Sequence, residues 1–348
     1  MRLGLMLGYS GGFAEAVQEV VDGEAAGVDL VVVPEAYSFD AVSQLGFLAA
    51  RTRRVRLASG IMQLYPRTPT LTAMTAAGLD HVSGGRFALG LGTSGPQVVE
   101  GFHGVPYDAP LGRTREVVEI CRKVWRRETL THDGRHYRIP LPPGEGTGLG
   151  KPLKLINRPE RTRIPVFLAA VGPRSVALAA EIAEGWHALF FDPDRAAAVW
   201  GDALAAGRAR RDPALGPLDI LAGAPFAITG APEPLLRAHR AQLALYIGGM
   251  GARAKNFSNA LVRRYGYARE AAVIQELYLS GRKAEATAAV PEDLVRATSL
   301  VGSREYIEDR LTAYRAAGVT TLLVSPLAPT PADRVKHLAA LRTLLPQH

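Results

Sequence analysis

A short segment near the middle of the chain combines the residue types of an anion-binding site. Val171 ends a predicted strand, Gly172 and Pro173 follow it, and Arg174 and Ser175 lie in the first turn of a predicted helix. Backbone N–H groups and the positive dipole end of a helix attract anions, and a guanidinium can bind two phosphate oxygens at once. Glycine, proline and serine also begin ordinary helices, so a plain helix start is the alternative. The position of the segment in the fold therefore decides whether it is a phosphate site.

Polar residues also follow the other predicted strands. Glu35 and Tyr37 follow the second strand, and Gln63 follows the third. The carboxyl ends of parallel strands lie at one edge of the sheet, where active sites of α/β proteins are built. The candidates at these ends are Gly8, Tyr9, Glu35, Tyr37, Ser59, Gly60, Ile61, Gln63, Thr93, Ser94, residues 171–175, Phe191, Asp192 and Ser325.

Hydrolytic and metal chemistry have little support in the sequence. There is no HExxH pair and no G-x-S-x-G elbow, and His132 and His136 lie in a turn-rich loop without carboxylate neighbours that would complete a metal site, so no metal ligand is expected. Only Glu35 and Asp192 qualify as paired carboxylates at strand ends. The single cysteine, Cys121, lies on the apolar face of a predicted helix and is expected to be buried. A cofactor that supplies its own reactivity is therefore the better hypothesis.

The elements that must position these residues alternate between short apolar strands and amphipathic helices. Such alternation predicts a parallel sheet covered by helices, and eight strand–helix units predict a closed (β/α)8 TIM barrel. The α/β barrel is expected to form a single domain over residues 1–348. Two interruptions are predicted: a long Gly/Pro-rich loop after the fourth strand, at about 130–163, and a helical insertion before the eighth strand, at about 232–298.

Composition narrows the class of partner. The 348 residues carry a formal net charge of +8, but the Lys and Arg residues are scattered and no aromatic platform accompanies them. We therefore expect an anionic small molecule rather than nucleic acid. No apolar stretch reaches the roughly 18 residues of a membrane span, and the N-terminus lacks the pattern of a signal peptide. The sequence predicts a cytoplasmic protein.

Several motifs are similar to those of one superfamily. The segment LDHVSGGRFALGLG, which begins at Leu79, resembles the luciferase-like monooxygenases, which are flavin- and deazaflavin-dependent barrels. More narrowly, GTSGPQVVEGFHG, EGTGLGKPLK and LYIGGMG resemble actinobacterial oxidoreductases that use the deazaflavin coenzyme F420. The similarity runs from MRLGLMLGY to AGVTTLLVSP. It implies a barrel that holds F420 at its mouth and, in most relatives, forms a homodimer.

The resemblance also implies where the cofactor lies. The family has a non-prolyl cis peptide at the end of the third strand, here Gly60–Ile61 or Ser59–Gly60, and a phosphate-binding turn that matches Gly172-Pro173-Arg174. The turn agrees with the anion site indicated by the residues themselves. The expected cofactor-binding residues are Ser59, Gly60, Ile61, Thr93, Ser94, Val171, Gly172, Pro173, Arg174 and Ser175.

The proton-transfer group is the point at which the chain departs from its relatives. They often carry Asp or His just after the second strand, whereas this chain has PEAYSF. Glu100 and His103 either act at the ring or brace their own loop. The polar candidates for catalysis near the ring are Glu35, Tyr37, Gln63, Glu100 and His103.

The leading hypothesis is an F420-dependent oxidoreductase that transfers a hydride to or from an organic small molecule. The alternatives are a monooxygenase that uses reduced FMN with O2, and a barrel that binds a cofactor without catalysis. We also expect the loop at 130–163 to be a lid or wall over the substrate. The basic residues expected along the glutamate tail of F420 are Arg67, Lys151, Lys154, Arg158, Arg161 and Arg163.

Overall fold

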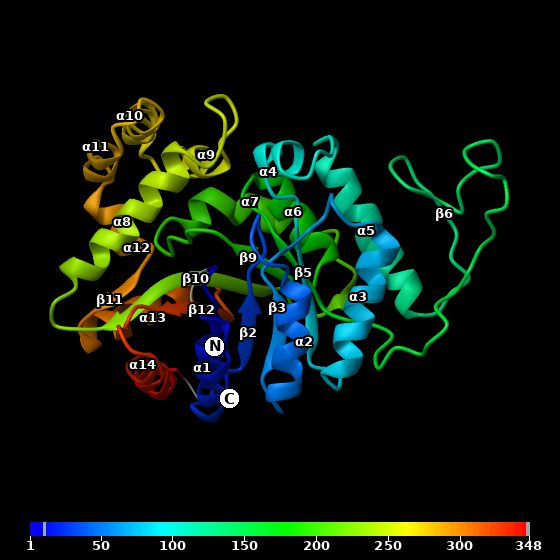
Figure 1. Ribbon diagram of the computed structural model, residues 1–348. Helices are drawn as coiled ribbons and strands as arrows, with labels where there is room; N and C mark the ends of the chain where they lie inside the picture. Colours follow the sequence, from blue (N-terminus) through cyan, green and yellow to red (C-terminus); the bar gives the residue numbers. More distant parts are fainter. Residues whose placement is uncertain (10–11, 346–348) are drawn as a thin grey trace.

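The computed structural model describes residues 1–9 and 12–345 and has a closed barrel of parallel strands (Figure 1). β10 pairs with both β9 and β12, and β12 pairs with β1, which closes the sheet on itself. The (β/α)8 prediction is confirmed. In order around the barrel, the strands are β1 (Arg2–Met6), β2 (Leu30–Val33), β3 (Arg56–Ser59), β5 (Phe87–Gly92), β8 (Val166–Ala169), β9 (Gly185–Ala188), β10 (Asp219–Ile228) and β12 (Thr321–Pro326).

The strands are short apolar runs because both of their faces are covered. In β2, all four residues are buried. Leu30 and Val32 belong to the small cluster that fills the barrel interior, together with Phe167, Leu221 and Leu323. The other apolar cluster lies between the strands and the surrounding helices and is much larger.

Helices surround the barrel, and several begin at residues suited to helix starts. Asp40 and Thr68 accept hydrogen bonds from backbone N–H groups in the first turns of α2 and α3. The apolar face predicted around Cys121 is buried, and Cys121 itself is fully buried. The surrounding helices are α1 (Phe13–Ala25), α2 (Ala41–Arg51), α3 (Pro69–Val82), α5 (Pro110–Trp125), α6 (Pro173–Ile182), α7 (Ala196–Arg208), α13 (Arg304–Ala316) and α14 (Pro331–Leu344).

The segment between β10 and β12 is helical up to a short strand, as predicted. Figure 1 shows these helices as a lobe beside the upper end of the barrel. The short strand β11 (Leu300–Gly302) pairs with the end of β10, a pairing that the sequence analysis did not predict. The helices of the lobe are α8 (Glu233–Gly248), α9 (Phe257–Arg264), α10 (Ala268–Leu279), α11 (Lys283–Ala288) and α12 (Glu292–Ala297).

Residues 130–163 form an arm that projects away from the barrel, with a small hairpin at its base (Figure 1). The hairpin pairs β6 (His132–Asp133) with β7 (Arg138–Ile139), and most of the remaining arm has no regular structure. Three further short elements are β4 (Met62–Gln63), α4 (Pro96–Gly101) and the 3-10 helix η1 (Pro213–Leu215). None of the helices in the described part of the chain combines the length and apolarity that a membrane crossing requires.

Candidate functional site

The carboxyl ends of the eight strands meet at the end of the barrel that we call the mouth. Two non-glycine residues there have left-handed backbones: Ser94 after β5, with φ of 54°, and Phe190 after β9, with φ of 46°. Such conformations cost about 1–3 kcal/mol and tend to persist at functional sites. Ser94 is one of the predicted cofactor-binding residues.

The end of β3 has the cis peptide that the resemblance implies, and it lies between Gly60 and Ile61. The Ser59 hydroxyl donates to the carbonyl oxygen of Gly90 at 2.8 Å and accepts from the Gly90 N–H at 3.0 Å. A Cβ atom on Gly90 would lie 1.8 Å from the Ser59 carbonyl oxygen, and one on Gly92 would lie 2.3 Å from the Ile61 side chain. The glycines of β5 therefore allow the backbone of β3 to bulge against them.

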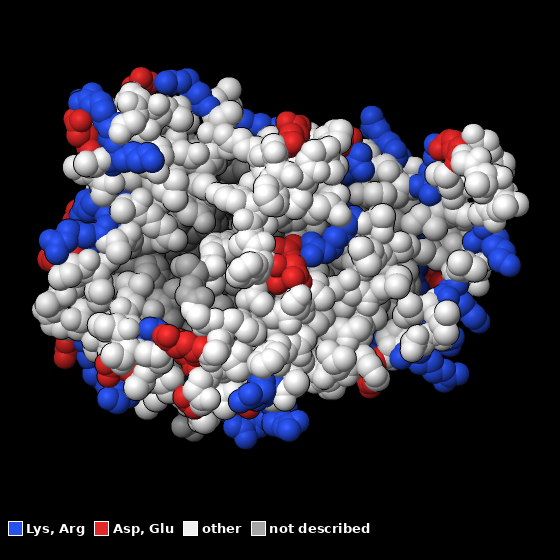
Figure 2. Space-filling view, viewed as in Figure 1, with Lys and Arg blue, Asp and Glu red and all other residues white. Residues whose placement is uncertain are grey.

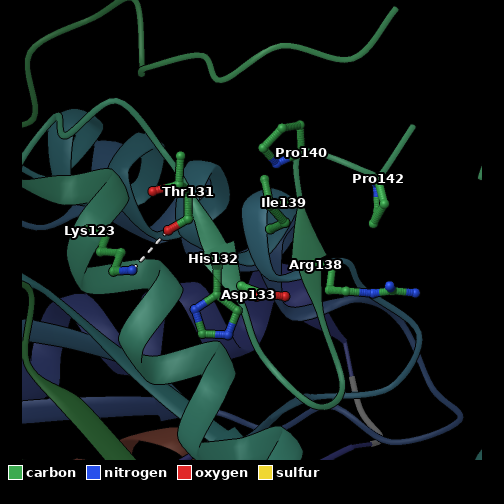
Figure 3. Close-up of a pocket in the computed structure, with 8 residues that line it drawn as sticks. All are labelled: Lys123, Thr131, His132, Asp133, Arg138, Ile139, Pro140 and Pro142. Atoms are coloured by element: carbon green, nitrogen blue, oxygen red, sulfur yellow. Dashed lines mark hydrogen bonds between the residues drawn. The ribbon is translucent and has the colours of Figure 1, made fainter. Parts of the chain in front are cut away.

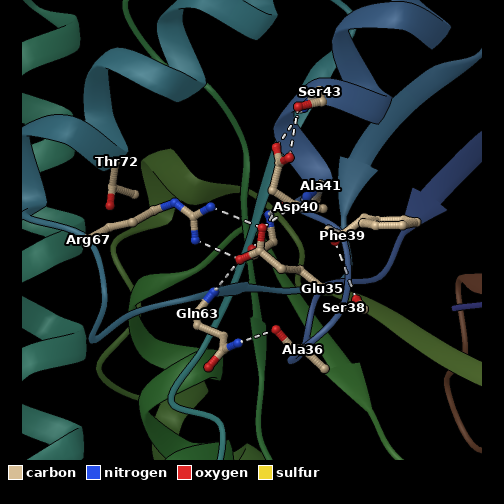
Figure 4. Close-up of polar contacts among 12 residues, drawn as sticks. Glu35, Ala36, Ser38, Phe39, Asp40, Ala41, Ser43, Gln63, Arg67 and Thr72 are labelled. Atoms are coloured by element: carbon tan, nitrogen blue, oxygen red, sulfur yellow. Dashed lines mark hydrogen bonds and ion pairs between the residues drawn. The ribbon is translucent and has the colours of Figure 1, made fainter. Parts of the chain in front are cut away.

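Glu35 is held in a network at the end of β2 (Figure 4). Arg67 donates to its two carboxylate oxygens at 2.6 and 3.0 Å, and the backbone N–H of Ala41 donates at 2.9 Å. The Gln63 backbone N–H lies 3.4 Å from the same carboxylate. Glu35 is buried with only 7% of its surface exposed. Because both oxygens are occupied, this carboxylate is placed to brace the strand ends rather than to exchange a proton.

The other polar candidates differ in what they contact. The Gln63 amide donates to the Ala36 carbonyl at 2.8 Å, whereas its Oε1 is buried without a partner among the described residues. The Nε2 of His103 is likewise buried and unpaired. Glu100 accepts from the Tyr107 backbone N–H at 3.0 Å, so it braces its own loop, which is one of the two alternatives considered for it. Buried unpaired atoms are uncommon in native proteins, so Gln63 and His103 are the better candidates for ligand contacts.

Tyr37 belongs to a group of aromatic side chains around the mouth. Its ring lies 6.2 Å from the ring of Phe102, which follows α4, and Phe102 contacts the ring of His103 at 5.1 Å. Tyr246 of α8 packs edge-on against Phe190 at 5.0 Å. The motif LYIGGMG contains Tyr246, but its sequence alone does not say that α8 returns to the mouth.

The predicted anion site lies at the N-terminus of α6. Gly172 is the N-cap residue, Pro173 is the first helical residue, and the Ser175 hydroxyl donates to the Gly172 carbonyl at 2.8 Å. Arg174 is exposed. The sequence analysis missed Arg264 of α9, whose Nη2 donates to the Val171 carbonyl at 2.8 Å.

The second terminal nitrogen of Arg264, Nη1, is buried without a partner in the described chain. Burial lowers the pKa of Arg264 from its ordinary value, although an arginine stays charged at neutral pH. A buried guanidinium nitrogen with no acceptor beside a helix N-terminus is suited to bind an oxygen of an anion.

Thr93 lies where the insertion lobe meets the loop after α4. The Tyr107 hydroxyl donates to the Thr93 hydroxyl at 3.3 Å. Lys255, in the loop between α8 and α9, places its Nζ 4.8 Å from the centre of the Tyr107 ring. The lobe and the barrel loops thus touch at this side of the mouth.

His187 of β9 is a further residue to which the sequence analysis gave no role. It is paired in register with Ala169 and Leu221, and Leu221 faces the barrel interior, so His187 faces it too. Burial lowers its pKa to about 4, and the imidazole is neutral at pH 7.

Three of the basic residues expected along the cofactor tail are paired with carboxylates of this chain. Arg161 pairs with Asp80 and donates to the Phe87 carbonyl, and Arg163 pairs with Glu184. These contacts lie where β5 and β8 begin, at the end of the barrel opposite the mouth. Arg67 is occupied by Glu35. These three arginines therefore do not line a path for a cofactor tail.

The arm is not a lid over the mouth. It lies along the outer side of α5: Lys123 donates to the Thr131 carbonyl at 2.8 Å, and Arg127 donates to the Leu155 carbonyl at 3.1 Å. The arm residues His132 and His136 do have a carboxylate neighbour, because Glu116 of α5 contacts both. The hollow at the base of the arm (Figure 3) is consequently separate from the mouth. No metal-binding cluster occurs in the part of the chain that the structure describes.

Comparisons with known proteins show the family to which the chain belongs. A family model described as luciferase-like monooxygenase matches residues 1–321. The chain belongs to this family. A Mycobacterium tuberculosis protein assigned to the coenzyme F420-dependent oxidoreductases is 44% identical over 354 residues, which cover 98% of this chain and 99% of that protein. The chain therefore belongs to a family of enzymes and matches a relative over nearly the whole length of both proteins.

Two solved structures share the luciferase-like fold. The coenzyme F420-dependent tetrahydromethanopterin reductase from Methanopyrus kandleri has a TM-score of 0.80 at 22% identity, over 97% of both chains. An F420-dependent secondary alcohol dehydrogenase, solved with an F420–acetone adduct, has a TM-score of 0.77 at 15% identity, over 99% of this chain and 99% of that one. At these identities the likeness supports the fold alone.

Proposed function

We propose that the protein binds coenzyme F420 at the barrel mouth and transfers a hydride between that coenzyme and an organic substrate. The observation that carries the proposal is the anion site at α6, where a helix N-terminus and the unpaired Nη1 of Arg264 converge. This site lies in a chain 44% identical to a relative assigned to the F420-dependent oxidoreductases. When bound, F420 supplies a carbon that can accept or donate a hydride.

The residues at the mouth fit such a group. The glycines of β5 let the backbone of β3 bulge at Gly60–Ile61, the strand end at which the resemblance places the cofactor ring. Gln63 Oε1 and His103 Nε2 are buried unpaired atoms that can bind polar edges of a ligand. Arg264, with residues 172–175, would bind the phosphate. The chain's contribution to catalysis is then mainly orientation and electrostatic stabilisation.

The experiment is a titration of the same protein with F420 and with FMN, followed by fluorescence. We expect F420 to bind at least tenfold more tightly, a difference of about 1.4 kcal/mol. Tighter binding of FMN, together with NAD(P)H-coupled oxygen uptake, would favour the monooxygenase alternative. Tight F420 binding with no turnover of alcohols, enones or imines would leave a barrel that binds the cofactor without catalysis.

We also propose that the protein is a homodimer. Leu71, Met74 and Val82 form an exposed apolar stripe on α3, and each is about half exposed. No atom lies within 4 Å of a Cβ built on Gly78, so this face is open. A second copy would cover it. Sedimentation equilibrium tests the proposal: Met74→Glu should shift a dimer toward the monomer, and a monomeric wild type contradicts it.

A further inference from the structure

The mouth exposes more aromatic surface than binding a cofactor phosphate requires. Tyr9 follows β1, Tyr37 follows β2, and Phe102 follows α4; their exposed fractions are 55%, 57% and 66%. Tyr37 and Phe102 are in ring contact, and Tyr246 lies over Phe190 on the insertion side. We call the space that these five side chains border the aromatic cleft. Exposed aromatic side chains gathered around the mouth of a barrel are typical of a binding site.

Tyr9, Tyr37 and Tyr246 are close enough for the ionisation of one to affect another. Burial, and then the neighbouring Tyr246 and Tyr37, raise the pKa of Tyr9 to about 12, although about half of its side chain is reachable by solvent. Burial, and then Tyr37, raise the pKa of Tyr246 as well. A side chain that is accessible yet surrounded by protein lines a cleft rather than a flat surface. The hydroxyl group of a tyrosine can donate a hydrogen bond.

The strand order places one side of this cleft across the barrel from the phosphate site. β1 and β8 are four strands apart in a barrel of eight; Tyr9 and Tyr37 follow β1 and β2, whereas α6 follows β8 and Phe190 follows its neighbour β9. A ligand that binds Tyr9 and Tyr37 therefore approaches the middle of the mouth from the side opposite the phosphate. The cleft and the anion site are two different parts of one active site.

Charged groups near the cleft are already occupied. Arg67 is paired with Glu35, and Lys255 lies over the Tyr107 ring. Figure 2 shows the hollow between the insertion lobe and the barrel bordered on this face mainly by uncharged surface. A phosphorylated or carboxylated substrate would need an unpaired cation to offset its desolvation, and the described side chains of the cleft include none.

We propose that the aromatic cleft binds an uncharged substrate with an apolar body and one carbonyl or hydroxyl oxygen, the oxygen being held by the tyrosine hydroxyls. This inference rests on the proposed function and names its substrate class. In the reducing direction the carbonyl carbon gains a hydride from reduced F420 and the oxygen gains a proton, originally from water. The C=O bond becomes CH–OH, and F420 is oxidised by the same two electrons.

The test uses the F420-loaded protein and a series of straight-chain 2-ketones from four to ten carbons, with kcat/KM measured for each. Burying each added methylene should raise kcat/KM about threefold until the cleft is full. A matched keto acid, which ends in a carboxylate, should fall below the ketone of the same length. A flat series, or a keto acid that is preferred, overturns the substrate class.

Variants separate the parts of the cleft. Phe102→Ser should flatten the dependence on chain length, whereas Val273→Ser, at an exposed apolar residue of α10, should leave it unchanged. Tyr246→Phe keeps the ring but removes a donor, so it should lower kcat/KM about fivefold for every ketone while the chain-length slope persists. An equal loss of slope in both serine variants, or an unaffected Tyr246→Phe, contradicts the assignment. F420 affinity is measured separately, so failure to bind F420 refutes the proposed function, whereas F420 binding with a flat series refutes this inference alone.

Discussion

The two ends of the barrel use polar residues in opposite ways. At the end where the strands begin, Glu24 accepts from the backbone N–H groups of Arg54 and Val55 at 2.6 and 2.7 Å. Arg86 donates there to the carbonyls of Ser83 and Val55 at 2.7 Å each, and to three further acceptors. These charged groups satisfy the backbone of turns that connect helices to strands.

At the mouth several buried polar atoms have no partner in the described chain, whereas the end where the strands begin has Arg122 Nε, on a guanidinium that also contacts Glu184. Gln63 Oε1, His103 Nε2 and Arg264 Nη1 are all buried and unpaired within the described residues. An unsatisfied buried group costs about 1–3 kcal/mol, so three of them at one end reduce stability unless a ligand binds them. The comparison indicates that one end of this barrel maintains the fold and the other is prepared for a ligand.

The largest expected effect is on stability, at the end where the strands begin. Asp80 is fully buried, accepts from Arg161 Nε at 3.1 Å, and accepts from the Phe87 backbone N–H at 3.3 Å. Asp80→Ala should lower the free energy of unfolding by about 4 kcal/mol, because it leaves a guanidinium and a backbone donor without their acceptor. Urea denaturation measures the loss, and F420 titration of the folded variant should give the wild-type affinity. A loss below about 1 kcal/mol would contradict the stabilising role of this end of the barrel, and weaker F420 binding would contradict its separation from the ligand site.

A second stability effect concerns the mouth side and depends on pH. Burial lowers the pKa of His239 in α8 to about 4, and its Nε2 lies 2.9 Å from the Thr298 hydroxyl. In the unfolded chain the pKa is about 6.5, so the unfolded state takes up the proton first as the pH falls. The folded state is therefore stabilised relative to the unfolded state by about 3 kcal/mol above pH 6.5, and this stabilisation is lost as the pH falls toward 4.

His239→Gln removes the titrating group and can keep a hydrogen bond to Thr298. The unfolding free energy of this variant should fall less steeply between pH 6.5 and 4 than that of the wild type. Urea denaturation at several pH values gives both slopes. Parallel slopes would mean that His239 is not buried as a neutral imidazole, and that the lobe at the mouth has no special sensitivity to acid.

The fold was largely predictable from the sequence because its periodicities are strong. Apolar runs such as Leu30–Val33 alternate with helices, and eight such units close a barrel. The exact ends of helices are less predictable: α5 begins at Pro110, and although proline is a favoured first helical residue, helix ends are uncertain by one or two residues. The arm had no period from which its direction could be inferred, and it lies beside α5 rather than over the mouth.

The candidate site was predictable only where it follows strand ends. The bulge at Gly60–Ile61 and the start of α6 were found in that way, whereas the pairing of Glu35 with Arg67 joins residues 32 apart in the chain. Arg264 lies in the insertion, 93 residues from Val171. Such contacts depend on how helices pack, and no local pattern of residue types specifies that.

The proposed contact of Arg264 with the phosphate predicts that the affinity for F420 depends on this side chain. Arg264→Ala should weaken F420 binding by about 2 kcal/mol, the range for a hydrogen bond to a charged group, because a buried nitrogen loses its contact with the phosphate. Arg263→Ala is the matched control: it is the neighbouring residue on α9, is exposed, and donates to Asn259. Fluorescence titration should give wild-type affinity for the control. Equal affinities of the two variants would remove Arg264 from the phosphate site.

The smallest expected effect is that of Arg174, which shares the anion site with Arg264 but is exposed. An exposed cation near an anion contributes about 0–1 kcal/mol and is screened by salt. Arg174→Ala should therefore weaken F420 binding by less than about 1 kcal/mol in dilute buffer. The loss should nearly vanish in 0.5 M salt, whereas the loss caused by Arg264→Ala should persist because that guanidinium nitrogen is buried. Titrations of both variants at the two salt concentrations test this directly. If the two losses fall equally with salt, Arg264 acts from solvent as Arg174 does, and the unpaired nitrogen at the mouth is not prepared for a phosphate.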